Sequence, residues 1–454
     1  MPTYRKLNCV FVALAVIGLS SCSSSSEQNY QGRIEKSIEQ INWSSEQADA
    51  IEATYLNDLI DIPELNKLIQ EALENNPSLQ QTLMALKIIY ATRSATNSDR
   101  IPQLTANFSG DKEESSDTSY SADLTVSWEL DIWNAIGDSI SAADKDIASS
   151  LATLQNAKDT LAANIMRAWL KISLQKQFVD IERKRLAVLQ NNETFILEKY
   201  RSGLGDLEDL DTAKTNSSST LSTLAEYTET LEQNKRSLTL LLGQLGEQKS
   251  YNISEKFPKV LTPLATLPEQ DLSRRPDLQS AFFKIEAEKY RTKAAYKALL
   301  PSISLELALS DSATSPSSAL LTSPLWSILG QLSAPLFKGG YLRAQATIAE
   351  LTTEKAYWNY QDTLLTAVNE VENALGQEKS LALQQKHLQD SYDSAVRSFA
   401  NYQEKYREGL VDISDLISVQ TDSFDVQESL VQVKYNRLVN RIDLGLALGL
   451  GVSQ

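Results

Sequence analysis

The chain has 454 residues and a formal net charge of −16, so its acidic surface excludes nucleic acid as a partner. It contains one histidine, His387, and two cysteines, Cys9 and Cys22, which are too few for a Ser-His-Asp triad, a His/Cys zinc site or a disulfide framework. The sequence also lacks the dinucleotide-binding, phosphate-binding and HExxH motifs. We therefore expect no enzyme, no cofactor and no metal site.

The first residues have the pattern of a secretory signal peptide. Arg5 and Lys6 form a basic region, residues 10–19 are apolar, and the sequence Leu-Ser-Ser-Cys ends at Cys22. An apolar stretch of this length is too short to span a bilayer. We expect residues 1–21 to be removed and Cys22 to carry lipid, because its surroundings resemble a bacterial lipobox. The alternative is a cleaved signal with an incidental cysteine.

Two segments alternate between apolar and polar residues. In residues 121–132 six apolar side chains share one face, and acidic and hydroxyl side chains share the other. Residues 302–310 repeat the alternation. Strands of this kind are typical of membrane-spanning β-structure, with one face in lipid and one in water. A half-buried strand of a soluble β-sandwich is the alternative, although acidic residues within one face argue against packing on both sides.

Each alternating segment has a predicted hairpin partner. Residues 103–109 precede the first and residues 326–337 follow the second, where Leu329 interrupts the pattern. The two hairpins therefore cover about residues 103–132 and 302–337. Four strands cannot close a transmembrane barrel, for which about eight is the minimum, and open edges are not tolerated in lipid. We expect several copies of the chain to share one barrel.

Long helices follow each hairpin. Residues 138–200 contain neither proline nor glycine, and residues 342–407 contain only Gly376, while apolar residues recur at spacings of three and four. Returning helices are predicted over about residues 207–242 and 413–448. The apolar stripes are narrow, which suits helices that pack side by side around a water-filled space.

A duplicated phrase marks the turn of each helical hairpin. Residues 198–210 read EKYRSGLGDLEDL and residues 404–416 read EKYREGLVDISDL, identical at 9 of 13 positions. A repeat of this length indicates two versions of one unit. We expect a first repeat at 22–243, a connector at 244–271 that lies near the middle of the long helices, and a second repeat at 272–454.

Several motifs together resemble a known family. They are the lipobox at Cys22, SWELDIW at 127–133, LSRRPDL at 272–278, LSAPLFKGG at 332–340 and the two KYRxGLxD turns. Over nearly the whole mature chain the sequence is similar to the TolC-like outer-membrane efflux proteins, in particular their lipoprotein (OprM/NodT) branch. One departure is that Asn134 and Ala135 follow the SWELDIW tryptophan, where the family has a glycine.

The resemblance implies an α+β membrane protein that assembles as a homotrimer. Three chains of four strands would share one transmembrane β-barrel, and their helical hairpins would form an α-barrel in the periplasm. Such a channel sits in the cell outer membrane, is lipid-anchored, and works with a periplasmic adaptor (membrane fusion) protein and an inner-membrane transporter. It would be a passive conduit for drugs or other small solutes.

The resemblance also implies a gate at the periplasmic end of the helices. Asp209 and Asp415 each follow a turn glycine by six positions and match carboxylates that constrict the family's lumen. Tyr406 matches a residue that closes that end by bonding across to the first repeat. Two family side chains are absent, since Val411 replaces an arginine and Ser418 an acid. The alternative is that both aspartates are helix-start residues favoured by the helix dipole.

The two hairpin turns are the predicted docking rim for the adaptor, because nearly identical sequence recurs only there. Each offers an exposed leucine beside a glycine, which suits the tip of another helical hairpin. The alternative is that the phrase repeats because glycine turns constrain sequence. The predicted docking residues are Arg201, Ser202, Gly203 and Leu204 in the first turn and Arg407, Glu408, Gly409 and Leu410 in the second.

Two other functions use similar sequence features. A TolC-like exit duct for type I protein secretion would have the same fold, and genomic neighbours would distinguish it from a solute channel. A non-channel structural lipoprotein built as a coiled coil would also contain long helices. The alternating strands argue against the coiled coil, which has no use for them.

Overall fold

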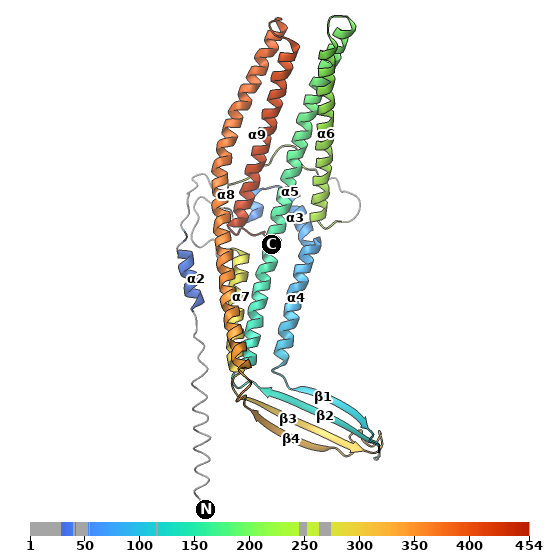
Figure 1. Ribbon diagram of the computed structural model, residues 1–454, viewed down its shortest axis with the longest axis vertical. Coiled ribbons are helices and arrows are strands. Elements are labelled where there is room, and N and C mark those ends of the chain that lie inside the picture. Colours follow the sequence, from blue (N-terminus) through green and yellow to red (C-terminus); the bar gives the residue numbers. More distant parts are fainter. Residues whose placement is uncertain are drawn as a thin grey trace, which may run out of the picture. The chain divides into compact units, whose positions relative to one another are not determined.

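The computed structural model describes residues 29–39, 41, 53, 55–114, 117–244, 252–262 and 274–453 (Figure 1). Cys22 and the predicted signal peptide lie outside these residues. The elements in chain order are α2 (Tyr30–Glu39), η1 (Leu56–Leu59), α3 (Pro63–Asn75), α4 (Pro77–Ser98), β1 (Gln103–Asp111), β2 (Ser119–Leu130), α5 (Ala135–Arg201), α6 (Leu207–Leu241), α7 (Pro276–Lys297), β3 (Ser302–Ala313), β4 (Leu325–Ser333), α8 (Tyr341–Arg407) and α9 (Ile413–Ala447).

The chain divides into two compact units. The first comprises residues 84–153 and 277–363 together with the described residues up to Ser37. The second comprises the described residues of 38–83, 154–276 and 364–454. No helix in the described part of the chain has a stretch long and apolar enough to cross a bilayer.

The first unit contains one antiparallel sheet in the order β1-β2-β3-β4 (Figure 1). Its register aligns apolar side chains of all four strands on one face, as in the row Leu104, Val126, Leu307, Ile328. The opposite face carries polar rows, such as Gln103, Ser127, Glu306 and Leu329, in which the leucine is the exception noted in the sequence. The predicted alternation is therefore confirmed, and the β2–β3 pairing joins the two halves of the chain.

The predicted ends of all four strands differ from the structure by a few residues, since β1 continues to Asp111 and β3 to Ala313. β4 ends at Ser333 rather than at residue 337, and Pro335, which has no N–H to donate, lies in the segment that leaves the sheet. β2 covers Ser119–Leu130 instead of 121–132. The Asp131 carboxylate accepts hydrogen bonds from the backbone N–H groups of Ile136 at 3.1 Å and Gly137 at 2.8 Å. It thus caps α5, which begins three residues earlier than predicted.

The turn into α5 requires a left-handed residue. Asn134 has φ 58°, a conformation that glycine adopts freely and that asparagine tolerates better than other side chains. The corresponding turn before α8 has Gly339 and Gly340 at φ 59° and 84°. Asparagine therefore serves in the first half where the resembled family uses glycine.

Helices in the two halves have equal lengths. α5 and α8 each contain 67 residues, α6 and α9 each contain 35, and α4 and α7 each contain 22. In the second unit α6 runs back beside the last part of α5, and α9 runs back beside the last part of α8 (Figure 1). We call these the first and second helical hairpins. Equal lengths are what a duplicated unit leads one to expect.

The returning helices end in the same way in both halves. In the first, the Asn76 side-chain amide donates to the carbonyl of Leu241, the last residue of α6, at 2.8 Å. In the second, the Arg275 guanidinium donates to the carbonyl of Ala447, the last residue of α9, at 3.0 Å. Asn76 directly precedes Pro77, the first residue of α4, and Arg275 directly precedes Pro276, the first residue of α7. The arginine and proline of the LSRRPDL motif therefore end one helix and begin another.

Short elements fill the core of the second unit. Leu56, Leu59 and Ile60, in and after η1, are fully buried, and the backbone N–H of Leu56 donates to the carbonyl of Gly451 at 2.9 Å. Of the predicted connector at 244–271 the structure describes residue 244 and residues 252–262, which form neither helix nor strand there.

Candidate functional site

The two hairpin turns have the same backbone geometry. Gly203 and Gly409 are left-handed, with φ 70° and 72°, and follow the last residues of α5 and α8. The N–H of Leu204 donates to the carbonyl of Lys199 at 2.9 Å, and the N–H of Leu410 to that of Lys405 at 2.8 Å. Each of these hydrogen bonds joins residues five positions apart and satisfies a carbonyl group that the end of the helix leaves free, as in a Schellman motif. The duplicated phrase thus encodes one turn twice.

Both turns present apolar surface. Leu204 is 76% exposed and Leu410 is 67% exposed, and a Cβ added at Gly203 or Gly409 would meet nothing within 4 Å. The other predicted docking residues, Arg201, Ser202, Arg407 and Glu408, are exposed as well. The turns therefore offer a bare backbone and two leucines to a partner.

The predicted gate aspartates occupy equivalent helix positions. Asp209 is the third residue of α6, and its backbone N–H donates to the side chain of Asp206 at 2.8 Å. Asp415 is the third residue of α9, and both aspartates are exposed. Acids at the start of a helix interact favourably with its dipole, which by itself accounts for their placement. Their role in a gate stays a prediction.

Tyr406 is the penultimate residue of α8. Its side chain is half-buried, and its hydroxyl has no hydrogen bond to another described residue of the same chain. The backbone carbonyl of Tyr406 accepts the N–H of Gly409 at 3.1 Å. The hydroxyl is thus available to a neighbouring copy.

Two ionic clusters in the second unit were not predicted. In the first, Arg185 of α5 is 2.7 Å from Asp425 and 3.6 Å from Glu428, both on α9. In the second, the Glu378 side chain on α8 is 7% exposed and pairs with Arg437 at 2.7 Å and Arg441 at 3.2 Å on α9. Burial lowers the pKa of the Arg441 guanidinium, while Glu378 counters that effect. No local sequence signal relates the partners of the first cluster, because α5 and α9 are far apart in the chain. The partners of the second cluster, on the consecutive helices α8 and α9, are still about 60 positions apart.

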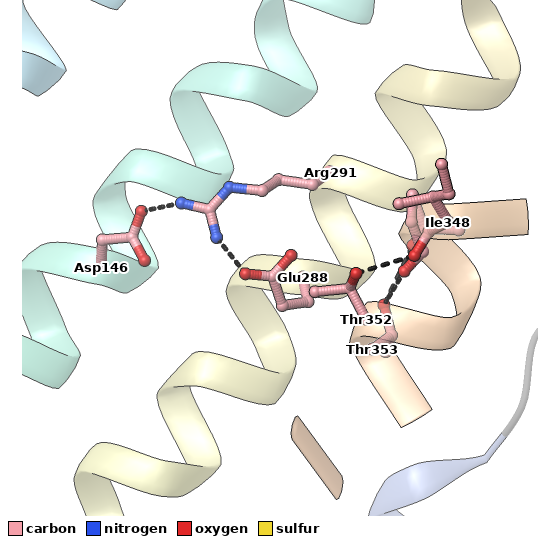
Figure 2. A network of polar contacts seen from close by, with 8 residues as sticks. Asp146, Glu288, Arg291, Ile348, Thr352 and Thr353 are labelled. Carbon is pink, nitrogen blue, oxygen red and sulfur yellow. Dashed lines mark hydrogen bonds and ion pairs between the residues drawn. The ribbon is translucent and has the colours of Figure 1, made fainter. Parts of the chain in front are cut away.

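A polar network in the first unit joins three helices (Figure 2). Arg291 of α7 pairs with Asp146 of α5, and with Glu288 of its own helix at 2.5 Å. The hydroxyls of Thr292 on α7 and Thr353 on α8 are 2.9 Å apart. These contacts fix the helices that enter and leave the sheet.

Helix α2 is fastened to α8 within the first unit. The Arg33 guanidinium donates to both carboxylate oxygens of Glu354, at 3.1 and 3.2 Å, and stacks on the Tyr357 ring at 3.7 Å from the centroid. Tyr30 and Ile34 are buried beside this pair. The beginning of the described chain is therefore held against the helix that leaves β4.

The sheet itself is incomplete. Within the part of the chain that the structure describes, β1 and β4 each pair with one neighbour, so both outer edges carry unpaired backbone groups. Large apolar side chains on the edge strands are exposed, for example Leu104 at 65% and Trp326 at 75%. Unpaired backbone groups at the two edges can be satisfied by strands of another chain. The exposed apolar face is stable only where it is covered by an apolar medium or a partner.

Comparisons with known proteins agree with this geometry. A family model described as outer membrane efflux protein matches residues 68–244 and 267–450. The chain is 27% identical over 401 residues to the probable outer membrane lipoprotein SilC of Salmonella typhimurium, covering 86% of each protein. It is 28% identical over 404 residues to the cation efflux system protein CusC of Escherichia coli, covering 86% of this chain and 87% of CusC. It is 26% identical over 429 residues to the outer membrane protein OprJ of Pseudomonas aeruginosa, covering 91% and 87%.

Solved structures share the fold. A crystal structure of CusC superposes with a TM-score of 0.79 at 24% identity, covering 89% of this chain and 96% of that one. The CmeC outer membrane channel of Campylobacter jejuni gives a TM-score of 0.80 at 22% identity, covering 92% of each.

Proposed function

This chain belongs to the outer membrane efflux protein family and is a channel component of an efflux system in the outer membrane, and we propose that three copies form one conduit. The observation that carries the proposal is the four-stranded sheet with an apolar face and two open edges. In lipid each unpaired backbone group costs several kcal/mol, so β4 of one copy is expected to pair with β1 of the next until the barrel closes.

The shared barrel predicts an obligatory oligomer. Detergent-purified protein should be a trimer by native mass spectrometry. Two copies would already supply the roughly eight strands of the smallest barrel, so the open edges predict an oligomer and the family resemblance predicts that it has three copies. A stable monomer that retains its full β-sheet content by circular dichroism would contradict the shared barrel.

The duplication supports the helical part of the channel. We infer that residues 22–243 and 272–454 are two copies of one unit, joined by a connector at 244–271. Two separate matches to the family model, equal helix lengths and equivalent caps at Leu241 and Ala447 support this division. Three chains would thus contribute six similar hairpins to one α-barrel.

We infer the protein partners of this chain from its membership of the outer membrane efflux protein family. A passive conduit needs an energised transporter in the inner membrane and an adaptor between them, and the exposed turns at Gly203 and Gly409 are the docking rim that we propose. Among the relatives, CusC is named for cation efflux and TtgF of Pseudomonas putida for toluene efflux. We propose small solutes as cargo, and co-purification of a cross-linked adaptor and transporter would test this assembly.

Cys22 is the proposed lipid anchor. It is eight positions before Tyr30, where the chain becomes fastened to α8, and the relative SilC is named a lipoprotein. Mass spectrometry of the mature N-terminus should find acyl mass on Cys22. An unmodified peptide that begins at another residue would contradict this proposal. Because the barrel is itself an anchor, Cys22→Ser should reduce sorting more than it disturbs the channel.

A further inference from the structure

The cluster around Arg185 joins the two helical hairpins of one chain. Arg185 and Glu182 belong to α5 in the first hairpin, and Asp425 and Glu428 belong to α9 in the second. Arg185 is 3.0 Å from Glu182, 2.7 Å from Asp425 and 3.6 Å from Glu428. Any movement that separates α5 from α9 at this level must break these ion pairs.

The cluster contains more negative than positive charge. One guanidinium faces three carboxyl groups, so full ionisation would leave an excess of negative charge around Arg185. The side chains of Arg185, Glu182 and Glu428 are 11%, 5% and 19% exposed, so water screens the repulsion between the two glutamates poorly, whereas the Asp425 side chain is 61% exposed and hydrated. The Glu428 Oε1 atom is buried and has no hydrogen bond to another described residue.

The surroundings of the cluster are apolar. Leu174 and Ile181 of α5 pack with Val431 of α9, and Phe178 and Phe424 lie against them. The Phe424 ring is 5.7 Å from the Arg185 guanidinium. On α6, the Tyr227 ring stacks on Phe178 with the ring centroids 5.6 Å apart, and Glu226 precedes Tyr227 in the chain. Neither supplies a second cation.

A proton resolves the imbalance. Burial raises the pKa of Glu428 from its ordinary 4.5 to about 7, and the nearby carboxylates of Glu182 and Asp425 add to the effect, while Arg185 opposes it. Burial also raises the pKa of Glu182. The carboxyl groups of Glu182 and Glu428 both lie against the Arg185 guanidinium, at 3.0 and 3.6 Å, so a proton on one of them removes the repulsion between the two.

We propose that the Arg185 cluster is a proton-dependent latch. When one of its carboxyl groups is protonated, the cluster holds the first helical hairpin against the second, and it releases the hairpin as the surrounding pH rises. The latch regulates the conduit proposed above and rests on that proposal for its role in transport. Its proton linkage is a property of the α5–α9 contact alone.

The direction follows from the linkage relation. When α5 and α9 separate, Glu428 becomes hydrated and returns toward its ordinary pKa, so opening releases one proton between pH 4.5 and about 7. The opening constant should therefore rise about tenfold per pH unit within this window and level off above it. Acidic medium keeps the latch closed.

Hydrogen exchange on the detergent-purified full chain tests the latch. Amides in peptides covering about residues 178–189 and 421–432 should open more readily as pH rises from about 5 to about 7, after correction for the intrinsic exchange rate. In Glu428→Gln the tenfold dependence per pH unit should be lost, because the amide cannot titrate, and only the smaller contribution of Glu182 should remain. Asp422→Asn, an exposed change on the same helix, should follow the wild type.

Two results would overturn the latch: a flat opening constant in the wild type, or an unchanged pH dependence in Glu428→Gln. Glu428→Gln should fold, because it resembles the protonated side chain that the closed cluster holds. Exchange requires no transport, so a protein that shows the linkage but forms no conducting channel in bilayers would contradict the proposed function and leave the latch standing.

Discussion

Replacing Tyr406 by phenylalanine should raise the resting conductance of the channel in planar bilayers. Its hydroxyl is unpaired within the described chain, so we expect it to donate to Asp209 of a neighbouring hairpin and to hold the periplasmic end closed. A hydrogen bond to a charged group contributes about 1.5–3 kcal/mol, which corresponds to a change of about tenfold or more in the ratio of open to closed channels. Tyr402→Phe, one turn earlier on α8, is the matched control.

Removal of both gate aspartates should have a different effect. Three copies each of Asp209 and Asp415 would place a ring of carboxylates around a narrow lumen, which attracts cations. Their joint replacement by alanine should weaken cation selectivity and block by multivalent cations, whereas Asp390→Ala on the exposed surface of α8 should not. Unchanged conductance and selectivity in all these variants would mean that the aspartates serve only as helix-start residues.

The second large effect concerns the docking rim at the hairpin turns. Replacing Gly203 or Gly409 by valine should abolish efflux while trimer formation and membrane insertion persist, as measured by drug susceptibility and native mass spectrometry. Valine strains a left-handed position by at least about 1–2 kcal/mol. Since a Cβ there meets no neighbour within 4 Å, the damage should stay confined to the turn.

Substitution of the turn glycines by asparagine distinguishes an effect on adaptor docking from an effect on turn geometry. It tolerates the left-handed conformation, so Gly203→Asn with Gly409→Asn keeps the turn but adds a side chain to the rim. Loss of adaptor binding in this variant would support a docking surface that needs bare backbone. Wild-type efflux in both the valine and the asparagine variants would rule out the site.

The exposed leucines give an independent test of the same rim. Each leucine buried by a partner contributes about 1.5–3 kcal/mol, so Leu204→Ser with Leu410→Ser should weaken adaptor binding about a hundredfold or more. Leu240→Ser is the control, because Leu240 is also 76% exposed but lies near the other end of α6. Equal binding by the double variant and the control would contradict docking through the leucines.

The sequence by itself determined the elements of this protein. The alternation in residues 121–130 predicted both faces of β2, because successive side chains of a strand point to opposite sides. The duplicated glycines predicted the two turns, because a left-handed residue is needed where each helix reverses. These signals are local: they depend on residues a few positions apart. The predicted ends of β2 and β4 were wrong by a few residues. Asp131 caps α5 instead of continuing β2, and Pro335 cannot donate a backbone hydrogen bond to extend β4.

Only the tertiary structure decided which elements meet. The β2–β3 pairing and the Arg185 cluster each join residues from opposite halves of the chain, and the Arg275 cap on Ala447 joins residues that are 172 positions apart. Many helix faces in this sequence carry similar acids, glutamines and alanines, so composition does not reveal which acid will be buried against which arginine. Burial and charge pairing arise only when two helices pack, and that packing turns Glu428 from an ordinary surface acid into one that holds a proton near neutral pH.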